Sequence, residues 1–582
     1  MDRQPLYFTI FILSILICSS FYLSWAADRG LGDVSVTRVS VESAPGRSVE
    51  LLIYSPRSVN HYEPMPVILT IHGLTGSKEG MFPFNIELAR RNFTVVSIDL
   101  PGHGDSIVQF DITDFTQMAQ DAYAALRYVQ TTFTSVDNES YGVLSHSLGF
   151  RVAIELEDFP ISPKAYAAVG DVGKLAQDEF IEFPRNLLLA VGVLDEIVSH
   201  QDALQAIRVA TGNESAIAGV TYGSLDNKTA YRLSFGLSNH ASEIVDSTLV
   251  NETVSWLVQG VQGESQILYT KAPSEQVYSN ENVASVSGSF FILISVIPVM
   301  WLVYSFLPER LKPRQISNKN HTYSFRKTFG ISSVLGAGMV IIFIASSLLG
   351  LYLEDLGIDW LNLMSGTGLI LFLIFAVVAM VLLMVLLMGS NNTNKVLSTG
   401  GVEVSIGIKE QVADILKSLI IAGFGISWIL FWLTLANSVE PGVLLLLIKL
   451  PLGIRSIDTA ILTIIAIPFF LVEASWIRWL LSIKMNQSEI FERIRQIGLL
   501  LISRFAMVGV LTVLVIIGTS AAGVSLGRIV LLGVIWVRII IVQLISTLIL
   551  TWASLKFENT WSAVMVVSFI FSLVLVATLP II

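Results

Sequence analysis

Cysteine and charge are what this sequence has least of. Only one of its 582 residues is a cysteine, Cys18, and only 14% are charged. Cys18 lies in an N-terminal apolar run, so the polar part of the chain has no cysteines for disulfides. If that part faces outward, its hydrophobic core alone must stabilise it. With 53% apolar residues, the composition is that of a membrane protein rather than of one soluble protein.

The few charges are unevenly distributed along the chain. Residues 28–283 carry 16 Lys and Arg against 32 Asp and Glu, a balance of −16, whereas the remaining residues carry 20 against 14. An acidic soluble part is therefore joined to a slightly basic membrane part. This balance argues against nucleic acid as a partner. No Cys/His cluster has the spacing of metal ligands, so we expect neither a metal nor a cofactor.

The order of apolar and polar segments predicts four parts. Residues 1–27 have Arg3, an apolar core and small residues near the end, as in a signal peptide or an uncleaved N-terminal anchor. Either would send residues 28–262 across the membrane. Residues 263–285 are polar without clear periodicity and read as a linker. Residues 286–582 are predicted to form a multi-pass transmembrane domain.

The soluble part is rich in glycosylation sequons. Five of its eleven asparagines begin an N-x-[ST] triplet, where about one or two are expected by chance; they are Asn92, Asn138, Asn213, Asn227 and Asn251. This favours an exported, glycosylated surface.

The membrane part contains eight apolar stretches of about 20 residues, the length of a transmembrane helix. They lie near 287–306, 331–353, 361–388, 413–437, 459–482, 497–519, 529–553 and 560–580. The shorter segment 443–453 is broken by Pro451 and is predicted to be interfacial or re-entrant. If the first span runs inward, the inner loops hold twelve Lys and Arg and the outer loops three. The positive-inside rule then places residues 28–262 outside the membrane.

The soluble part alternates strand-like and helix-like patterns, which is typical of a mostly parallel sheet with crossover helices. Residues 121–133 and 242–259 are predicted helices. The predicted strands are VSVTRVSVES, VELLIYSP, PVILTIHG, FTVVSIDLPG, SYGVLSHS, AYAAVGD, NLLLAVGVLD and AYRLSFGLS. The predicted fold class is therefore α/β, followed by an all-α transmembrane domain of about eight helices.

Three chemically competent side chains follow three of these strands. Ser147 lies in SHSLG, which is one residue away from the G-x-S-x-G nucleophile elbow because Ser145 replaces the first glycine. Asp195 and His240 each come directly after a later strand. In this Ser, Asp, His order, His240 would act as general base to Ser147, and Asp195 would orient the imidazole. The backbone N–H groups of Leu148 and Leu74 are the expected oxyanion donors.

These loops resemble those of a known superfamily. IHGLTGSKEG, IDLPGHGDS, SHSLG, VGVLDEIV and SNHASEIV resemble the successive signature loops of α/β-hydrolases, with lysophospholipase-like, serine aminopeptidase-like and dienelactone hydrolase-like groups nearest. The resemblance covers roughly residues 35–262 and says nothing about the membrane spans. It implies a serine hydrolase that uses Ser147, His240 and Asp195.

Other polar residues near these motifs have plainer interpretations. We expect His72 and His103 to shape the fold, His146 to pack beside the nucleophile and His200 to lie on the surface. Asp171 also follows a strand and is the rival to Asp195, whereas Glu196 is interpreted as a neighbour of the acid. Glu473, Arg504 and Arg538 lie within predicted spans. They are either functional, or they snorkel toward the membrane surface or form a structural Glu–Arg pair.

The sequence thus predicts a membrane-anchored extracytoplasmic esterase or lipase-type hydrolase acting on an ester, lipid or peptide-like substrate beside the lipid bilayer. A serine peptidase of the same fold is one alternative. A transporter or sensor whose hydrolase-like domain only binds ligand is the other.

Overall fold

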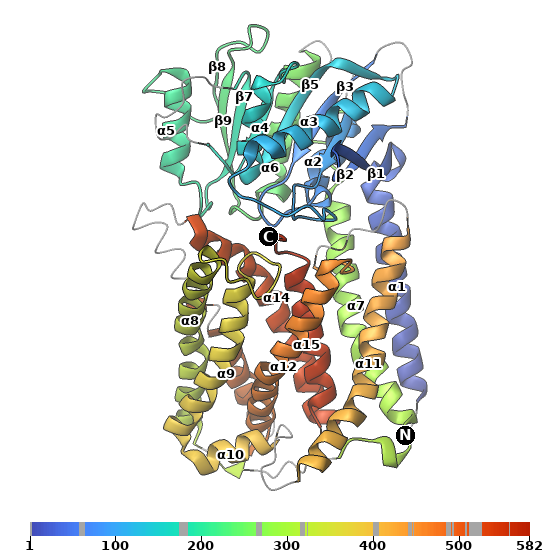
Figure 1. Ribbon diagram of the computed structural model, residues 1–582, viewed down its shortest axis with the longest axis vertical. Helices are drawn as coiled ribbons and strands as arrows, with labels where there is room; N and C mark the ends of the chain where they lie inside the picture. The colour runs from blue at the N-terminus through green and yellow to red at the C-terminus, as the bar shows by residue number, and fades with distance from the viewer. Residues whose placement is uncertain are drawn as a thin grey trace.

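The computed structural model describes residues 3–57, 64–173, 184–263, 271–314, 321–322, 324–399, 407–439, 445, 447–484, 491, 494–506, 509–510, 527–557 and 559–582. A sheet with its covering helices occupies the upper end of Figure 1, and a bundle of long helices lies below it. The two bodies correspond to the polar and the apolar parts of the sequence.

The upper body is built around one nine-stranded sheet with the strand order β1-β2-β4-β3-β5-β6-β7-β9-β8. The strands from β4 to β9 run parallel, while β1, β2 and β8 pair antiparallel with their neighbours. The strands are β1 (Val34–Ala44), β2 (Arg47–Pro56), β3 (Met65–Ile71), β4 (Thr94–Ile98), β5 (Val136–His146), β6 (Tyr166–Val169), β7 (Leu187–Gly192), β8 (Thr221–Tyr222) and β9 (Tyr231–Gly236). Each of the eight predicted strands is confirmed, and the two-residue β8 is an addition.

Helices cover both faces of this sheet, which gives a three-layer domain. One apolar core joins the sheet to α3 (Phe115–Thr132), α4 (Leu148–Glu155) and α5 (His200–Thr211). A second core joins the opposite face to α2 (Phe82–Ala89) and α6 (Ser247–Leu257). The central strands are buried on both faces, which explains why they read as continuous apolar runs. The predicted fold class is confirmed.

The lower body is helical. Six helices of the described residues are long and apolar enough to cross a membrane: α1 (Gln4–Asp28), α7 (Ser279–Phe306), α8 (Phe325–Asp355), α9 (Gly366–Met388), α11 (Ile408–Ser438) and α12 (Ile454–Leu481). Two shorter apolar stretches are residues 540–556 of α14 (Gly527–Lys556) and α15 (Trp561–Val576). Five predicted spans are thereby confirmed as long helices. The predicted span 497–519 lies partly outside the described residues. A short helix, α10 (Ser390–Thr399), and the strand pair β10 (His321–Thr322) and β11 (Ile483–Lys484) complete this body.

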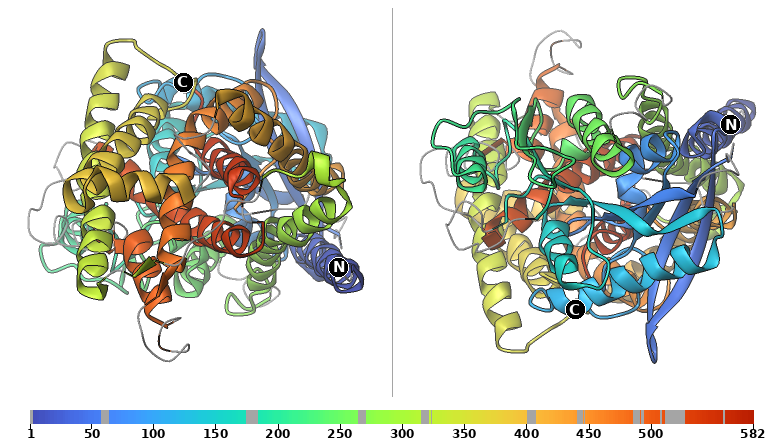
Figure 2. Two further views of the ribbon diagram at one scale, coloured as in Figure 1. Left: turned by 90° about the horizontal axis from the view of Figure 1, so that it is seen from below. Right: turned by 90° about the horizontal axis from the view of Figure 1, so that it is seen from above.

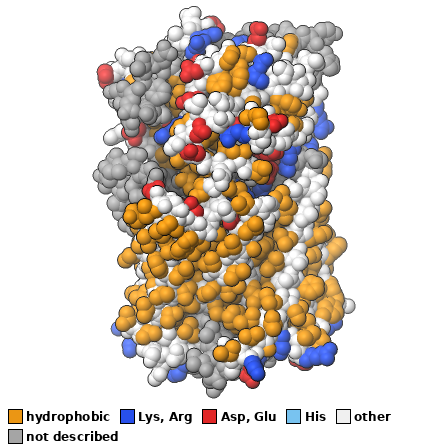
Figure 3. Space-filling view, viewed as in Figure 1, with side chains coloured by type: hydrophobic (Ala, Val, Ile, Leu, Met, Phe, Trp, Pro, Cys, Tyr) orange, Lys and Arg blue, Asp and Glu red, His pale blue; other side chains and the backbone are white. Residues whose placement is uncertain are grey.

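The surface of the lower body is that of a membrane protein. On the face shown in Figure 3, a broad band of apolar side chains covers it, with charged side chains gathered at the far end and over the sheet domain. The bundle is seen end-on in Figure 2, where α1 lies at its edge. There α1 packs along α7, burying Ile17 and Phe21, and Ser24 Oγ donates to Glu281 at 2.6 Å.

A buried ion pair explains two of the intramembrane charges. Glu473 on α12 pairs with Arg504, whose guanidinium also donates to Ser546 and Thr547 on α14. Hydrogen bonding from several helices is what a charge in hydrocarbon requires. Glu473 and Arg504 therefore form the Glu–Arg pair that was one of the interpretations of these charges. The side chain of Arg538 lies outside the described residues.

Candidate active site

Ser147 is held in a strained turn between β5 and α4. Its backbone has φ 49° and ψ −124°, a conformation that costs a non-glycine residue about 1–3 kcal/mol. Its N–H donates to Val169 O at 2.8 Å, and its carbonyl accepts from Phe150 N at 2.9 Å. The strand, the helix and the neighbouring strand β6 together hold this turn. The geometry is that of a nucleophile elbow.

The departure from the glycine pattern in this turn has a structural explanation. A Cβ on Gly149 would lie 2.5 Å from Ile71 O and 2.8 Å from His72 O, so α4 can approach β3 only with glycine there. Ser145 is 1% exposed, yet its side chain is accommodated, and its Oγ donates to Ala167 O at 3.4 Å. The second glycine of the motif is therefore required, whereas the first position tolerates a small polar side chain.

The three residues predicted as a triad lie together. Ser147 Oγ is 2.9 Å from His240 Nε2, and His240 Nδ1 is 2.9 Å from Asp195 Oδ2. Because an ionised carboxylate only accepts, the Nδ1 proton lies toward Asp195, and Nε2 is free to accept the serine proton. The N–H groups of Ile197 and Val198 donate to Asp195 Oδ1 and fix the carboxylate.

The charges around His240 favour its protonated form relative to free histidine. Burial lowers the pKa of His240, but the hydrogen bond and charge of Asp195, with Glu196 and Asp171, outweigh burial and raise it above the ordinary 6.5. Burial raises the pKa of Asp195, but the hydrogen bond and charge of His240, with the hydrogen bonds from Glu243 and Ile197, together outweigh burial, so the net shift is downward. This pair stabilises the imidazolium that forms during proton transfer.

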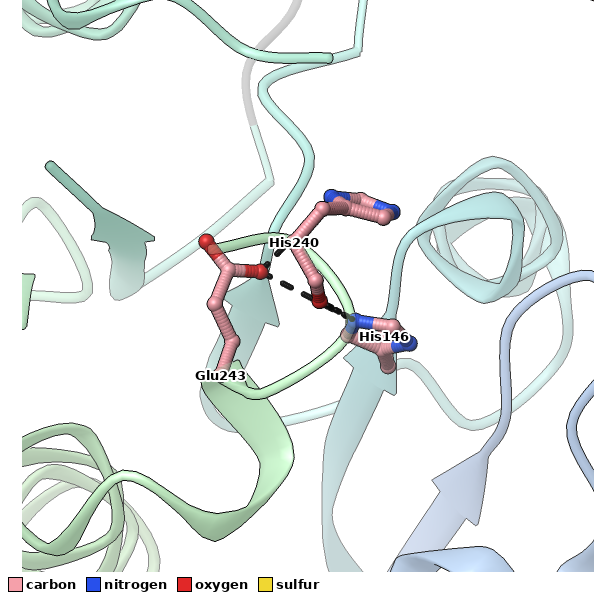
Figure 4. A group of neighbouring side chains, drawn as sticks. All are labelled: His146, His240 and Glu243. Atoms are coloured by element: carbon pink, nitrogen blue, oxygen red, sulfur yellow. Dashed lines mark hydrogen bonds and ion pairs between the residues drawn. The ribbon is translucent and has the colours of Figure 1, made fainter. Parts of the chain in front are cut away.

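Glu243 is a buried carboxyl group that sequence reasoning missed. Figure 4 shows it beside His146 and His240; its Oε2 lies 3.8 Å from His240 Nδ1 and 3.8 Å from His146 Nε2. Its Oε1 accepts from Gly192 N at 2.5 Å. Burial and the nearby Asp195 charge raise the pKa of Glu243 to about 11, so the group is a neutral acid near pH 7 and can donate to Asp195. Its position three residues after His240 carries no distinctive motif.

This cluster also contains the atoms of a potential metal site, since the ligand atoms of His146, His240 and Glu243 lie within 4.8 Å of one another. However, Asp195 already accepts from His240 Nδ1, and Gly192 N already donates to Glu243. Burial lowers the pKa of His146 to about 3, and its Nε2 lies 3.3 Å from His240 O. We interpret the cluster as support for the triad.

The remaining candidates from the sequence occupy structural positions. His72 Nε2 accepts from Leu100 N at 3.0 Å, which leaves Nδ1 to donate to Gly73 O at 2.7 Å. His103 is buried against Phe110, and His200 is exposed on α5, stacked on Phe235. The rival acid Asp171 accepts from Gly173 N and lies 4.0 Å from Arg151.

The two expected oxyanion donors belong to segments that adjoin Ser147. Leu148 is the first residue of α4, where helical N–H groups lack intrahelical acceptors. Leu74 follows Gly73, at which a Cβ would lie 2.9 Å from both Ser147 Cβ and His146 Nδ1. The loop after β3 therefore touches the nucleophile, and Leu74 belongs to that loop.

Part of the chain is similar to known proteins. Residues 62–157 match the family described as serine aminopeptidase, S33. A curated relative is the dihydrolipoyllysine-residue acetyltransferase component of an acetoin cleaving system from Cupriavidus necator. It is 34% identical over 107 residues, which are 18% of this chain and 26% of the relative. The chain thus matches about a quarter of that relative's length.

Two solved structures are also similar. A dienelactone hydrolase from Anabaena variabilis is 14% identical with a TM-score of 0.30, covering 39% of this chain and 99% of that one. An esterase from Pyrococcus furiosus is 14% identical with a TM-score of 0.30, covering 40% of this chain and 94% of that one.

Proposed function

We propose that the N-terminal domain, an α/β-hydrolase domain, is a membrane-anchored serine hydrolase that cleaves carboxylic esters through an acyl-enzyme. The observation that carries the proposal is the pair of 2.9 Å contacts that join Ser147 to His240 and His240 to Asp195. A nucleophile, a base and an orienting carboxylate in line are the arrangement that activates a serine.

The reaction follows from these contacts in two halves. Ser147 Oγ attacks the ester carbonyl while its proton passes to His240 Nε2, and the N–H groups of Leu74 and Leu148 receive the oxyanion. The imidazolium then protonates the ester's alkoxide oxygen as its bond to the carbonyl carbon breaks, so an alcohol leaves and the acyl group stays on Ser147. Water attacks that acyl group with His240 as base, releasing a carboxylic acid and restoring the serine hydroxyl. The route uses only groups of this chain and water.

The rim of the site favours an apolar acyl group. Leu194 and Leu237, on the loops that carry Asp195 and His240, are 62% and 83% exposed. These loops adjoin, because Val193 N donates to Gly236 O and Leu194 N donates to Ser238 O. Exposed apolar side chains beside a catalytic residue match the chain of an ester or lipid substrate better than a charged peptide.

A serine peptidase of the same fold is the second candidate. The match of residues 62–157 to the serine aminopeptidase family favours it. An aminopeptidase needs an anionic group for the substrate's ammonium, and Glu196 lies beside the base, accepting from His240 N at 3.2 Å. The substrate panel below separates the two activities.

We further propose that the hydrolase domain lies outside the membrane and that α1 is a retained anchor. The excess of Lys and Arg in the loops predicted to face inward supports this orientation. The burial of Ile17 and Phe21, together with the Ser24–Glu281 hydrogen bond, supports retention of α1.

Labelling with a fluorophosphonate probe tests the proposal in the full-length protein. The native protein should be labelled, and Ser147→Ala should not be. Ser135→Ala, just before β5 at the opposite edge of the sheet, is the matched control and should label normally. Equal labelling of Ser147→Ala would overturn the assignment, and no labelling of the native protein would favour a binding-only transporter or sensor. Turnover of p-nitrophenyl esters against aminoacyl anilides then decides between esterase and peptidase.

A further inference from the structure

The helical bundle contacts the edge of the sheet that carries the active site. In the loop between β4 and α3, Gly102 O accepts from Ile581 N at 2.8 Å, and Phe110 N donates to Ile581 O at 2.9 Å. Arg455, at the start of α12, donates to Gly102 O at 2.7 Å and to Leu579 O at 2.8 Å. Figure 1 shows this loop directly above residues 577–582. Main-chain pairing and a buried guanidinium thus join the two domains.

The fit at this junction is close. Gly102 has φ +70°, and a Cβ there would lie 2.4 Å from Ile581 O. Arg455 is 8% exposed, so its charge is held by carbonyl oxygens rather than by water. The loop after β4 therefore fits closely against the bundle, and a side chain at position 102 would disrupt this contact.

A second contact comes from the segment predicted to be interfacial or re-entrant. Its described residues 447–453 form neither helix nor strand, and Lys449 extends from it to the sheet domain. Lys449 Nζ lies 2.7 Å from Asp105 Oδ1 and 3.7 Å from Glu79 Oε1. Both carboxylates also contact Lys78 Nζ, at 2.6 Å and 3.1 Å.

Lys449 completes a charge balance that the hydrolase domain alone leaves negative. Fully buried Lys78 faces three carboxylates, since Asp99 also lies 2.5 Å from its Nζ. Within that domain, Arg38 is a second cation at 4.0 Å from Glu79. Among the described residues in contact within 4.0 Å, three negative charges then face two positive ones of the hydrolase domain, and Lys449 supplies a third positive charge. Buried charges are stable only when paired, so removing Lys449 should disturb this group.

The charge cluster holds the loop that carries Leu74. At the loop's far end, Lys78 N donates to Asp99 Oδ1 at 2.7 Å. At its near end, Leu100 N donates to His72, whose ring donates to Gly73 O. The loop after β4 therefore fixes the loop after β3 at both ends. Contacts from the bundle to the loop after β4 should therefore also help to fix the position of the loop after β3.

We propose that Lys449 and Arg455 of the membrane domain are positioning residues for the oxyanion side of the hydrolase site. This inference rests on the proposed function. Without these contacts Ser147, His240 and Asp195 stay in place, but Leu74 loses its fixed position, so transition-state stabilisation falls while ester binding does not.

Kinetics of the full-length protein in detergent test the proposal. Lys449→Met and Arg455→Met should each lower kcat on p-nitrophenyl acetate by about 10-fold to 100-fold, a fraction of the loss from deleting an oxyanion donor. KM should stay within about 2-fold, and affinity for a boronic acid, which mimics the tetrahedral state, should fall in parallel with kcat/KM. Lys449→Arg should restore most of the activity.

Controls separate positioning from folding and from the function itself. Lys271→Met, in the predicted linker, removes an exposed ion pair with Asp33 of the hydrolase domain and should change nothing. The number of sites titrated by fluorophosphonate should stay constant, which shows that the variants are folded. In an Asp105→Asn background, Lys449→Met should have little further effect. If the native protein turns over ester and both Met variants keep its kcat, the positioning role is wrong and the function stands; an inactive native protein refutes the function instead.

Discussion

The hydrolase domain and the helical bundle both need glycine for close approach, but they use it differently. A Cβ on Gly149 would meet Ile71 O at 2.5 Å, and on Gly350 of α8 it would meet Gly368 Cα of α9 at 2.2 Å. The first contact lets a helix start beneath the nucleophile. The second lets two apolar helices touch where lipid competes equally for their surfaces. Glycine therefore shapes a site in one region and packing in the other.

Buried charged groups also have different roles in the two regions: they support the candidate site in one and helix packing in the other. In the hydrolase domain, Lys78 and Glu243 each begin a short 3₁₀ helix beyond the carboxyl end of a strand and lie near the candidate site. In the bundle, Glu473 and Arg504 lie within helices and satisfy one another and neighbouring hydroxyl groups. Substitutions in the first region should change catalysis, and those in the second should change stability.

The largest expected effect is on the triad. Asp195→Asn should lower kcat by roughly 10⁴-fold, because the amide stabilises the wrong imidazole tautomer. The unfolding temperature should change little, since the side chain keeps its shape. Turnover of a soluble ester and thermal unfolding measure the two quantities; an active Asp195→Asn would return the role to Asp171.

Much of this site could be predicted because each member follows a strand. The strands are continuous apolar runs, and the order of Ser147, Asp195 and His240 selects one arrangement. Glu243 and Lys78 could not be predicted, since their neighbours come together only by folding. Lys449 meets Asp105 across 344 positions, and no periodicity links them. In the bundle, hydropathy locates the helices but not the glycine contacts between them.

The next largest effect sharpens the contrast in packing. Gly350→Ala should destabilise the bundle by about 1–3 kcal/mol, the usual cost of overpacking, because α8 must move away from α9. Thermal unfolding in detergent measures it. Gly330→Ala on the same helix meets no atom within 4 Å and is the control. Equal unfolding temperatures for the two variants would contradict the proposed packing role.

Glu243 should show a smaller effect that depends on its protonation. A neutral acid donates to Asp195 and accepts from Gly192 N, and a glutamine amide can do both. Glu243→Gln should therefore keep kcat within about 3-fold, whereas Glu243→Ala, which leaves buried groups unpaired, should lose about 10-fold or more. Steady-state kinetics at pH 7 measures both. A Gln variant as impaired as the Ala variant would show that Glu243 is ionised.

The smallest effect concerns pH. The protonated form of His240 cannot accept the Ser147 proton, so kcat/KM is lost as pH falls through the pKa of His240. Burial lowers that pKa, but the hydrogen bond and charge of Asp195, with smaller contributions from Glu196 and Asp171, together outweigh burial and raise it above the ordinary 6.5. The acid limb of the native profile should therefore have its midpoint above pH 6.5.

Glu196→Gln removes one of the charges that raise the pKa of His240 but leaves the Asp195–His240 hydrogen bond. It should therefore move the midpoint of the acid limb to lower pH with little change in the plateau. Profiles for a soluble ester measure both, with Glu214→Gln, an exposed site on the same domain, as control. If the midpoint in Glu196→Gln equals that of the native protein, the acid limb reports the titration of a group other than His240.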